Sequence, residues 1–359
     1  MTNVSTPKIE KRLKRDKFDI LDAAISAIMF ILLQYVIVVV FYMFPPVFLK
    51  SKAFEYIGQI AIEGLFLLSV YLTAVIRDTE WVTASGMREK FNSKVCVFGL
   101  VVAAVSLLCF ARLADLFIYF IQSLGYRYKY TAIDVSNFGF FLLSLVVHCA
   151  VPAFTEELLF RGTICSGLEK KNKHLAVFVS ALLFMLMHSN PLQTVHQFIL
   201  GIVYGYIFVY THNIWISVFA HFLNNGLTVT MYYISTLVYP EAILEDGTII
   251  GFEPVSGSQL AINIVTGIVL AVVGALLMVY ILKALKKHFA KKEEISENSE
   301  EVKLETETVK EQDKNDKFAT NIFNDKQKRQ KLWITLLFII VGVILVKDWV
   351  TALISGFAL

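Results

Sequence analysis

Residues 140–162 read FFLLSLVVHCAVPAFTEELLFRG, an apolar run that carries two adjacent carboxylates and an arginine. The run is long enough to cross a bilayer as a helix, which needs about 20 apolar residues. Its surroundings are apolar too, because 56% of the 359 residues are hydrophobic and the mean hydropathy is +0.62. Charged residues make up 18%, against about 25% in soluble domains. The composition therefore predicts a membrane protein.

Apolar runs of spanning length recur along the chain, separated by charged or turn-forming clusters. We expect about eight spans and one appended C-terminal helix, so the predicted fold is all-α, a polytopic bundle of transmembrane helices. The runs are 21–48, 53–76, 95–121, 138–168, 175–190, 194–210, 214–237, 260–285 and, interrupted by Lys347-Asp348, 332–359.

The remaining composition excludes two classes of protein. The four cysteines lie in or beside apolar runs without CxxC pairing, which argues against a secreted disulfide scaffold. The formal net charge of +3 is too small to suggest a nucleic-acid partner. Residues 286–331 hold 23 of the 63 charged side chains, and we interpret them as a solvated, disordered or partly helical linker. A regulatory or docking role for this segment is the alternative.

Ionisable residues inside membrane spans are costly and usually functional, so they are the informative positions. Glu156, Glu157 and Arg161 share one predicted helix. Glu157 and Arg161 are four residues apart and can form an intrahelical ion pair. Glu156 points about 100° away from Glu157, which leaves its carboxylate free to act.

Two further motifs follow on later spans. Phe184 stands one turn before His188 at the end of its span, and His221 shares a helix face with Asn225. Counted from the basic loop 169–174, Glu156 and His188 both lie about 20 Å deep, and counted from His212 at the next inner turn, His221 lies roughly 13 Å deep. These depths allow one shared intramembrane site. A general base that activates water, with polarised donors for an oxyanion, suits hydrolysis.

Other polar residues in the spans have simpler explanations. Glu63 could pair with Arg112 on the third span or could line a cavity. His148 is a single histidine on an apolar helix, which more often makes a helix contact than binds a ligand. His196 and His212 fall near span ends, where an interfacial histidine is ordinary.

The three motifs, in this order on successive spans, resemble the CPBP intramembrane protease family, which includes CAAX-type prenyl-protein endopeptidases and bacterial Abi or bacteriocin-immunity relatives. The resemblance rests on Glu156-Glu157-xxx-Arg161, Phe184-xxx-His188 and His221-xxx-Asn225, within about 148–228. It implies that Glu156 is the catalytic base and that His188 helps to bind the water. It also implies that His221 and Asn225 stabilise the oxyanion.

We expect the chain to be divided into six segments. These are a cytoplasmic basic arm at 1–20, N-terminal transmembrane helices at 21–135, a catalytic core at 136–237, an outer loop and the following transmembrane helix at 238–285, a charged cytoplasmic linker at 286–331 and a C-terminal hydrophobic helix at 332–359. The expected function is an intramembrane endopeptidase that acts on a membrane-associated peptide or a prenylated, CAAX-like protein. Its partners would be the bilayer and that substrate, with no nucleic acid.

Two alternatives stay open. Glu156, His188 and His221 could supply three zinc ligands and an open water position, although we favour water activated directly by glutamate, without a cofactor. A non-enzymatic immunity or scaffold protein of the same fold is the functional alternative. Retention of every motif residue favours the enzyme.

The distribution of Lys and Arg predicts the orientation in the membrane, which we expect to be a bacterial plasma membrane. The predicted inner segments carry 27 of these residues and the outer loops carry 4, so the N-terminus and the 286–331 segment should be cytoplasmic.

Reporter fusions test this orientation. A reporter that is active only in the cytoplasm should give a signal when it is fused after Ser299 and none when it is fused after Asp246. The same reading from both sites would mean that the number of spans between them is wrong.

Overall fold

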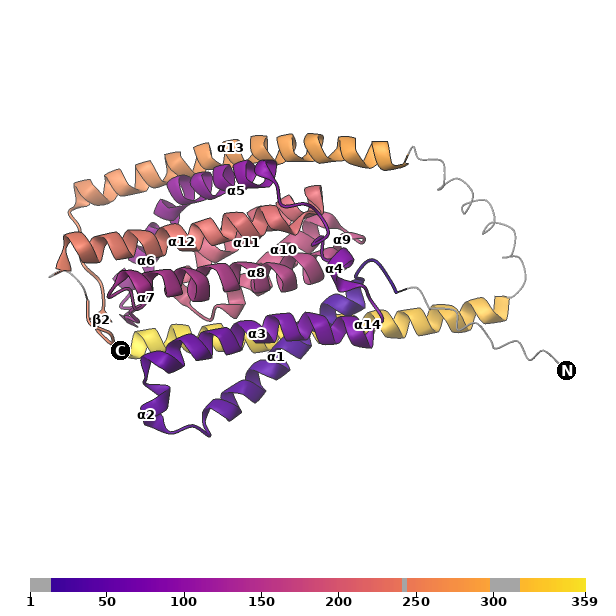
Figure 1. Ribbon diagram of the computed structural model, residues 1–359, viewed down its shortest axis with the longest axis horizontal. Coiled ribbons are helices and arrows are strands. Elements are labelled where there is room, and N and C mark those ends of the chain that lie inside the picture. Colours follow the sequence, from indigo (N-terminus) through magenta and orange to yellow (C-terminus); the bar gives the residue numbers. More distant parts are fainter. Residues whose placement is uncertain (1–13, 241–243, 298–316) are drawn as a thin grey trace.

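The computed structural model describes residues 14–240, 244–297 and 317–359, without the side chains of 290–297 and 317–329. Most of these residues are helical, and the helices run roughly side by side (Figure 1). This confirms the predicted all-α polytopic bundle. The elements are α1 (Ile20–Phe41), α2 (Pro46–Leu49), α3 (Lys52–Ile76), α4 (Trp81–Ala84), α5 (Ser93–Val105), η1 (Ser106–Phe110), α6 (Ala111–Ser123), β1 (Tyr128–Lys129), α7 (Phe138–Ser144), η2 (Leu145–Ala150), α8 (Val151–Glu157), η3 (Leu158–Cys165), α9 (Ser166–Glu169), α10 (Lys173–Met187), η4 (Pro191–Gln193), α11 (Thr194–Thr211), α12 (Ile214–Val238), β2 (Ile249–Ile250), α13 (Gly257–Glu297) and α14 (Lys317–Ala358).

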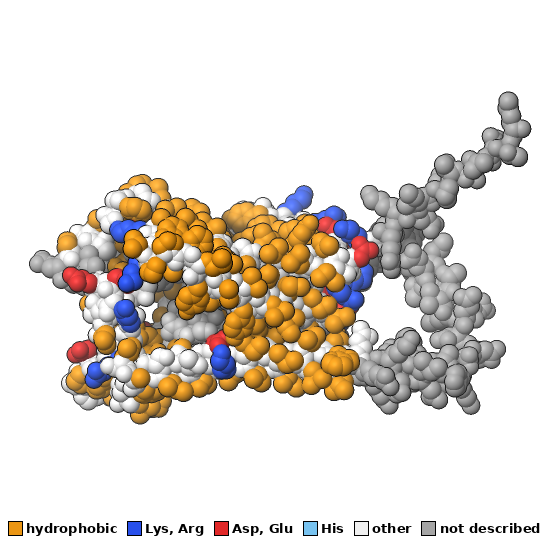
Figure 2. Space-filling model, turned by 90° about the horizontal axis from the view of Figure 1, so that it is seen from below, with side chains coloured by type: hydrophobic (Ala, Val, Ile, Leu, Met, Phe, Trp, Pro, Cys, Tyr) orange, Lys and Arg blue, Asp and Glu red, His pale blue; other side chains and the backbone are white. Residues whose placement is uncertain are grey.

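Among the described residues, seven helices are long and apolar enough to cross a membrane. They are Ile20–Phe41, Lys52–Ile76, Ser93–Ser123, Phe138–Glu169, Pro191–Thr211, Gly257–Phe289 and Gln330–Ala358. Helices are also present at the two other predicted spans, 175–190 and 214–237. They are α10, which has 15 residues, and α12, which has 25. Figure 2 shows hydrophobic side chains over the middle of one face and charged side chains mainly at its two ends. The chain is thus an integral, multi-pass membrane protein.

The helices pack around a central group formed by α8, η3, α10, α11 and α12. Helix α13 runs along one side of the molecule, where it packs on α5, α6 and α11, and α1, α3 and α14 lie on the opposite side (Figure 1). Two large clusters of buried apolar side chains fill the two sides, one centred on α1, η3 and α10 and the other on α5, α11 and α13. The polar residues of the three motifs therefore lie between apolar layers.

Asparagine side chains begin four of the helices. Asn92, Asn137, Asn172 and Asn213 each accept hydrogen bonds from backbone N–H groups of the first turn of α5, α7, α10 and α12. Such caps satisfy donors that a helix start would otherwise leave unpaired. Short polar links between long apolar runs therefore define where the central helices begin.

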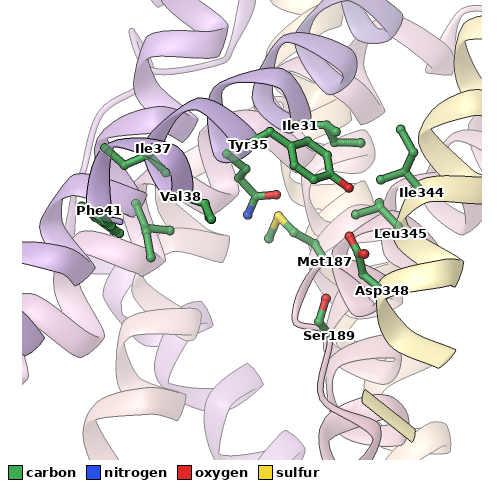
Figure 3. A pocket seen from close by; sticks show the side chains of 12 residues that line it. Ile31, Tyr35, Ile37, Val38, Phe41, Met187, Ser189, Ile344, Leu345 and Asp348 are labelled. Atoms are coloured by element: carbon green, nitrogen blue, oxygen red, sulfur yellow. The ribbon is translucent and has the colours of Figure 1, made fainter. Parts of the chain in front are cut away.

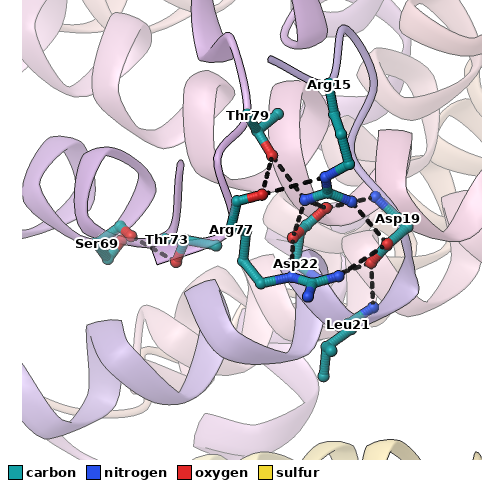
Figure 4. A network of polar contacts seen from close by, with 8 residues as sticks. All are labelled: Arg15, Asp19, Leu21, Asp22, Ser69, Thr73, Arg77 and Thr79. Carbon is teal, nitrogen blue, oxygen red and sulfur yellow. Dashed lines mark hydrogen bonds and ion pairs between the residues drawn. The ribbon is translucent and has the colours of Figure 1, made fainter. Parts of the chain in front are cut away.

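An ion network joins the entry of α1 to the end of α3 (Figure 4). Asp19 and the fully buried Asp22 each bind both Arg15 and Arg77, at N–O distances of 2.8–3.1 Å. Burial acts to raise the pKa of Asp19, but the Asp22 backbone and the two guanidinium groups outweigh it and hold that pKa below its ordinary value. Asp19 therefore stays ionised and keeps α1 fixed to α3.

The charged segment is helical at both of its described ends. Helix α13 continues to Glu297 and α14 already begins at Lys317, 15 residues before the predicted start at 332, while 298–316 lie outside the described residues. Lys, Arg and Gln are good helix formers, so a helix can continue beyond its apolar part. Helix α14 packs against α1 and α10, and Trp349 Nε1 donates a hydrogen bond to Thr194 Oγ1 at 3.0 Å. The appended helix is thus part of the bundle.

Candidate active site

The structure brings the four predicted reactive residues to one cavity of about 390 Å³. Glu156 comes from α8, His188 from the end of α10, and His221 and Asn225 from α12. The other lining residues belong to α3, α11 and neighbouring segments; they are Gln59, Ile133, His148, Pro152, Gln193, His196, Gln197, Asn224, Thr228 and Val229. Motifs that are separated by more than 30 positions in the chain therefore face the same space.

The two adjacent carboxylates differ in their surroundings. Glu156 lines the cavity, and its Oε2 accepts no hydrogen bond from the described residues. Glu157 is fully buried, and its Oε1 accepts a hydrogen bond from Arg161 Nη1 at 2.7 Å. Both lie at the end of α8, where one residue step turns a side chain by about 100°. The helix geometry thus separates the two carboxylates as the spacing predicts.

Arg161 is fully buried inside the bundle. Its guanidinium carbon lies 4.4 Å from the ring centre of Phe184 and 5.4 Å from that of Tyr204, and Nη2 donates to Gly201 O at 3.4 Å. Long cationic side chains in a span often reach toward the membrane interface, but Arg161 does not. Aromatic faces and Glu157 stabilise the cation within the bundle instead. Phe184, proposed as a supporting residue, provides one of these faces.

A glycine permits this arrangement. A Cβ atom on Gly201 would lie 2.8 Å from both Cα and Cβ of Ala181 on α10, which is too close for any side chain. The backbones of α10 and α11 can therefore approach closely. This approach places the rings of Phe184 and Tyr204 around the guanidinium of Arg161.

His221 connects both carboxylates. Its Nδ1 lies 3.1 Å from Glu157 Oε1, and its Nε2 lies 3.8 Å from Glu156 Oε2. The ring is almost fully buried and stacks on Tyr204. Since a carboxylate accepts hydrogen bonds, its contact favours a proton on Nδ1 and leaves Nε2 facing Glu156. Glu157 therefore holds His221 as well as Arg161, a contact that the sequence spacing did not reveal.

His188 is positioned by the end of its own helix. Its Nδ1 lies 2.8 Å from the carbonyl oxygen of Phe184, and it caps α10 just before Ser189, whose φ of 46° is left-handed. Donation from Nδ1 to that carbonyl leaves Nε2 of a neutral ring as a hydrogen-bond acceptor. An acceptor on the cavity wall is suited to holding a water molecule.

Asn225 is half-buried on the cavity wall, and its neighbour Asn224 is buried. Asn224 Nδ2 lies 3.5 Å from Asn225 Oδ1 and 3.3 Å from His196 Nε2. The first contact uses the carbonyl of Asn225 and leaves its Nδ2 as a donor. Sequence reasoning missed Asn224 and treated His196 as interfacial. The adjacent amide in Asn224-Asn225 is the only signal that could have indicated them.

The suggested pairing of Glu63 with Arg112 is wrong. Arg112 lies 3.8 Å from Asp115 on its own helix, and both are exposed. Glu63 instead accepts hydrogen bonds from Thr155 and Gln59, beside the cavity. His148 also lines the cavity, where its Nε2 is 3.7 Å from Glu55 Oε1, and His212 ends α11 with Nδ1 3.6 Å from Glu169 Oε1.

A second, mostly apolar pocket of about 260 Å³ lies between α1 and α14 (Figure 3). Side chains of α1 face those of α14 across it, and Met187 and Ser189, which flank His188, also line it. Its polar atoms come from Gln34, Tyr35, Ser189 and Asp348. An apolar chain held here would lie next to the end of α10.

The site does not fit a zinc ion in this arrangement. No group of three His, Cys, Asp or Glu side chains in the described ranges is placed to hold one metal. His221 directs Nδ1 to Glu157, so only Nε2 remains for another ligand. We therefore derive no chemical step through a metal.

Comparisons with known proteins agree with the geometry. Residues 138–227, which contain the three motifs, match the family model described as Type II CAAX prenyl endopeptidase Rce1-like. Over these residues the chain is similar to that family. This confirms the resemblance drawn from the motifs, over the part of the chain that carries the site.

One similar protein is YdiL of Bacillus subtilis (strain 168), which is named as a membrane peptidase. It is 29% identical over 90 residues, which are 25% of this chain and 37% of that protein. The match thus spans well under half the length of this curated relative. No solved structure matches the chain.

The two histidines should differ in their effect on stability. His221→Ala removes a buried ring and its hydrogen bond to Glu157, so it should cost roughly 2–4 kcal/mol. His188→Ala should leave the melting temperature almost unchanged, because that ring is half-buried and bonds only to its own helix. Thermal melting in detergent measures both variants. Equal melting temperatures would mean that the contacts of His221 contribute nothing to the fold.

Proposed function

We propose that this protein is an intramembrane endopeptidase that cleaves a peptide bond of a membrane-associated or lipid-modified peptide. The observation that supports it most is the free carboxyl of Glu156 on a cavity shared with His188, His221 and Asn225. All four residues lie within the stretch that matches the prenyl endopeptidase family.

Water activation is assigned to Glu156 and His188. A water molecule donates one hydrogen bond to Glu156 and another to the Nε2 acceptor of His188. Glu156 removes a proton as the water oxygen attacks the carbonyl carbon of the scissile peptide bond. The C=O π electrons move to oxygen, which gives a tetrahedral intermediate with a negative charge.

The oxyanion is assigned to the donors on α12. Asn225 Nδ2 is free because Asn224 contacts the carbonyl of Asn225. His221 Nε2, which lies 3.8 Å from Glu156 Oε2, donates to the oxyanion when the ring carries both protons. When the intermediate collapses, the C–N bond breaks and Glu156 returns its proton to the leaving amine, which yields a carboxylic acid and an amine.

Glu157 acts as a positioning residue in this proposal. Its contact with Nδ1 fixes the direction of the His221 ring, and Arg161 balances its charge. Arg161 itself is fully buried behind the cavity and touches no substrate. The reaction therefore needs Glu157 ionised and in place, although it does not exchange protons with the substrate.

The apolar pocket between α1 and α14 supports a substrate with an apolar or lipid-modified segment. It lies beside His188, so such a segment can rest in the pocket while the adjacent peptide bond enters the cavity. Lipid modification at a C-terminal CAAX sequence is one chemistry of this kind. The family description names prenyl endopeptidases.

Water activation in this proposal needs no metal. We also propose that the N-terminus and the charged segment are cytoplasmic, as the Lys and Arg distribution favours, in a bacterial plasma membrane. A non-enzymatic immunity or scaffold protein remains the alternative that the following experiment separates.

The experiment measures cleavage of two quenched fluorescent peptides by the full chain in lipid nanodiscs. One peptide carries a farnesylated cysteine four residues from its C-terminus, and the other lacks the farnesyl group. Wild type should cleave the first peptide better. Glu156→Gln should lower kcat by about 10²–10⁴-fold with an unchanged melting temperature, because it removes the base and keeps the shape.

Asp115→Asn is the matched control, since it makes the same change at an exposed carboxylate outside the cavity. Cleavage should also survive treatment with a chelator. Activity retained by Glu156→Gln would remove this residue from the chemistry. Activity that is lost on chelation and restored by zinc would contradict the metal-free step. Binding of the peptide without cleavage by wild type would favour the scaffold alternative.

A further inference from the structure

A third buried carboxyl, which the mechanism does not use, lies beside the cavity. Glu63 is 2% exposed near the middle of α3. No Lys, Arg or His in the described part of the chain forms an ion pair with it. Each of its two oxygens has one partner, because Oε1 accepts from Gln59 Nε2 at 2.9 Å and Oε2 accepts from Thr155 Oγ1 at 2.5 Å. Burial of a carboxyl group without a cationic partner is energetically costly, so we expect Glu63 to have a function.

The first contact fixes the direction of an amide in the cavity. Gln59 stands one turn before Glu63 on α3 and lines the same cavity as Glu156. With Nε2 donating to Glu63, the planar amide must turn its carbonyl oxygen away from that carboxyl. No described residue donates a hydrogen bond to the carbonyl oxygen of Gln59, which therefore remains available to a bound molecule.

The second contact fixes the distance of this amide from the reacting groups. Thr155 precedes Glu156 in α8, and its hydroxyl also contacts the carbonyl oxygen of Val151 at 3.0 Å. Glu63 therefore ties the helix that carries Gln59 to the helix that carries Glu156. The two residues face one cavity from two helices that are joined by a buried hydrogen bond.

A peptide bound in this cavity needs acceptors for its backbone N–H groups. An N–H group that leaves water and finds no acceptor costs about 1–3 kcal/mol, so a site for extended peptides must supply them. Glu156 is engaged with the water in the proposed mechanism. Asn224 Oδ1 and Gln197 Oε1 also lack a hydrogen-bond partner among the described residues that line the cavity. The amide of Gln59 differs from both because a buried carboxyl, Glu63, binds its Nε2 and is itself bonded to the helix of Glu156.

We propose that Gln59 is a substrate-binding residue whose carbonyl oxygen accepts a backbone N–H of the bound peptide, and that Glu63 is the positioning residue that sets the direction of this amide. This inference rests on the proposed peptidase function. It adds a substrate contact from α3, which lies outside the stretch that matches the family model.

Substitutions of Glu63 and Gln59 can separate the effect of the direction of the Gln59 amide from the effect of the charge of Glu63. Glu63→Gln can still accept from Gln59 with its carbonyl and donate to Thr155 with its amide, so it preserves the arrangement. Glu63→Leu removes both contacts and frees Gln59 to rotate. Gln59→Leu removes the acceptor itself. Ser69→Ala is the matched control, because Ser69 is a buried polar residue of α3 that bonds only to its own helix, at Phe66 O.

The test compares KM and kcat for the farnesylated quenched peptide in nanodiscs. Gln59→Leu should raise KM about three- to tenfold, the effect of one neutral hydrogen bond, with kcat within about twofold of wild type. Glu63→Leu should raise KM similarly, and Glu63→Gln should recover most of the loss. Ser69→Ala should match wild type. A substrate scan in which single peptide N–H groups are replaced by ester oxygens should find one position that weakens wild type but not Gln59→Leu.

The outcomes distinguish this inference from the proposed function. If wild type cleaves and Gln59→Leu keeps the wild-type KM, the inference is overturned and the peptidase function stands. If wild type does not cleave, the function fails, and fluorescence anisotropy with the same peptide then tests Gln59 directly. Weaker binding by Gln59→Leu than by Ser69→Ala supports the contact, whereas equal binding, or no binding by wild type, overturns it.

Discussion

The ion pair between Glu157 and Arg161 is the interaction on which the rest of the site depends. A guanidinium group fully buried in a membrane-spanning bundle is stable only with a counter-charge and hydrogen bonds around it. Glu157 supplies the charge at 2.7 Å, and the rings of Phe184 and Tyr204 cover the cation. Helix η3, α10 and α11 therefore meet at one charged centre, which determines how the central helices pack.

This charged centre also gives the two adjacent carboxylates, Glu156 and Glu157, different contacts. Glu157 Oε1 is shared by Arg161 and His221, so this group is committed to holding other side chains. Glu156, one residue earlier, has turned to the cavity wall, and its Oε2 is free of hydrogen bonds from the described residues. A carboxyl group at membrane depth can thus face the cavity while its neighbour stabilises the fold.

Sequence reasoning predicted the parts of this arrangement that depend on helical spacing. The four-residue interval gives the Glu157–Arg161 pair, and counting along the spans brings Glu156, His188 and His221 to similar depth. Contacts between helices were not predictable in this way, because a sequence does not specify which faces meet. The hydrogen bond from His221 to Glu157, the pair of His196 with Asn224, and the partners of Glu63 all belong to this class. The full burial of Arg161 was not predictable for the same reason, since the rings that cover it come from other helices.

The measurement that tests the central claim most directly is a double-mutant cycle of thermal stability on Glu157→Gln, Arg161→Met and the combined variant. Each single change leaves one buried charge without its partner and should cost about 3–5 kcal/mol, whereas the combined variant leaves none. The account predicts that the combined variant is more stable than either single variant. Additive losses would show that the two charges do not stabilise each other, and the division between Glu156 and Glu157 would then have no physical basis.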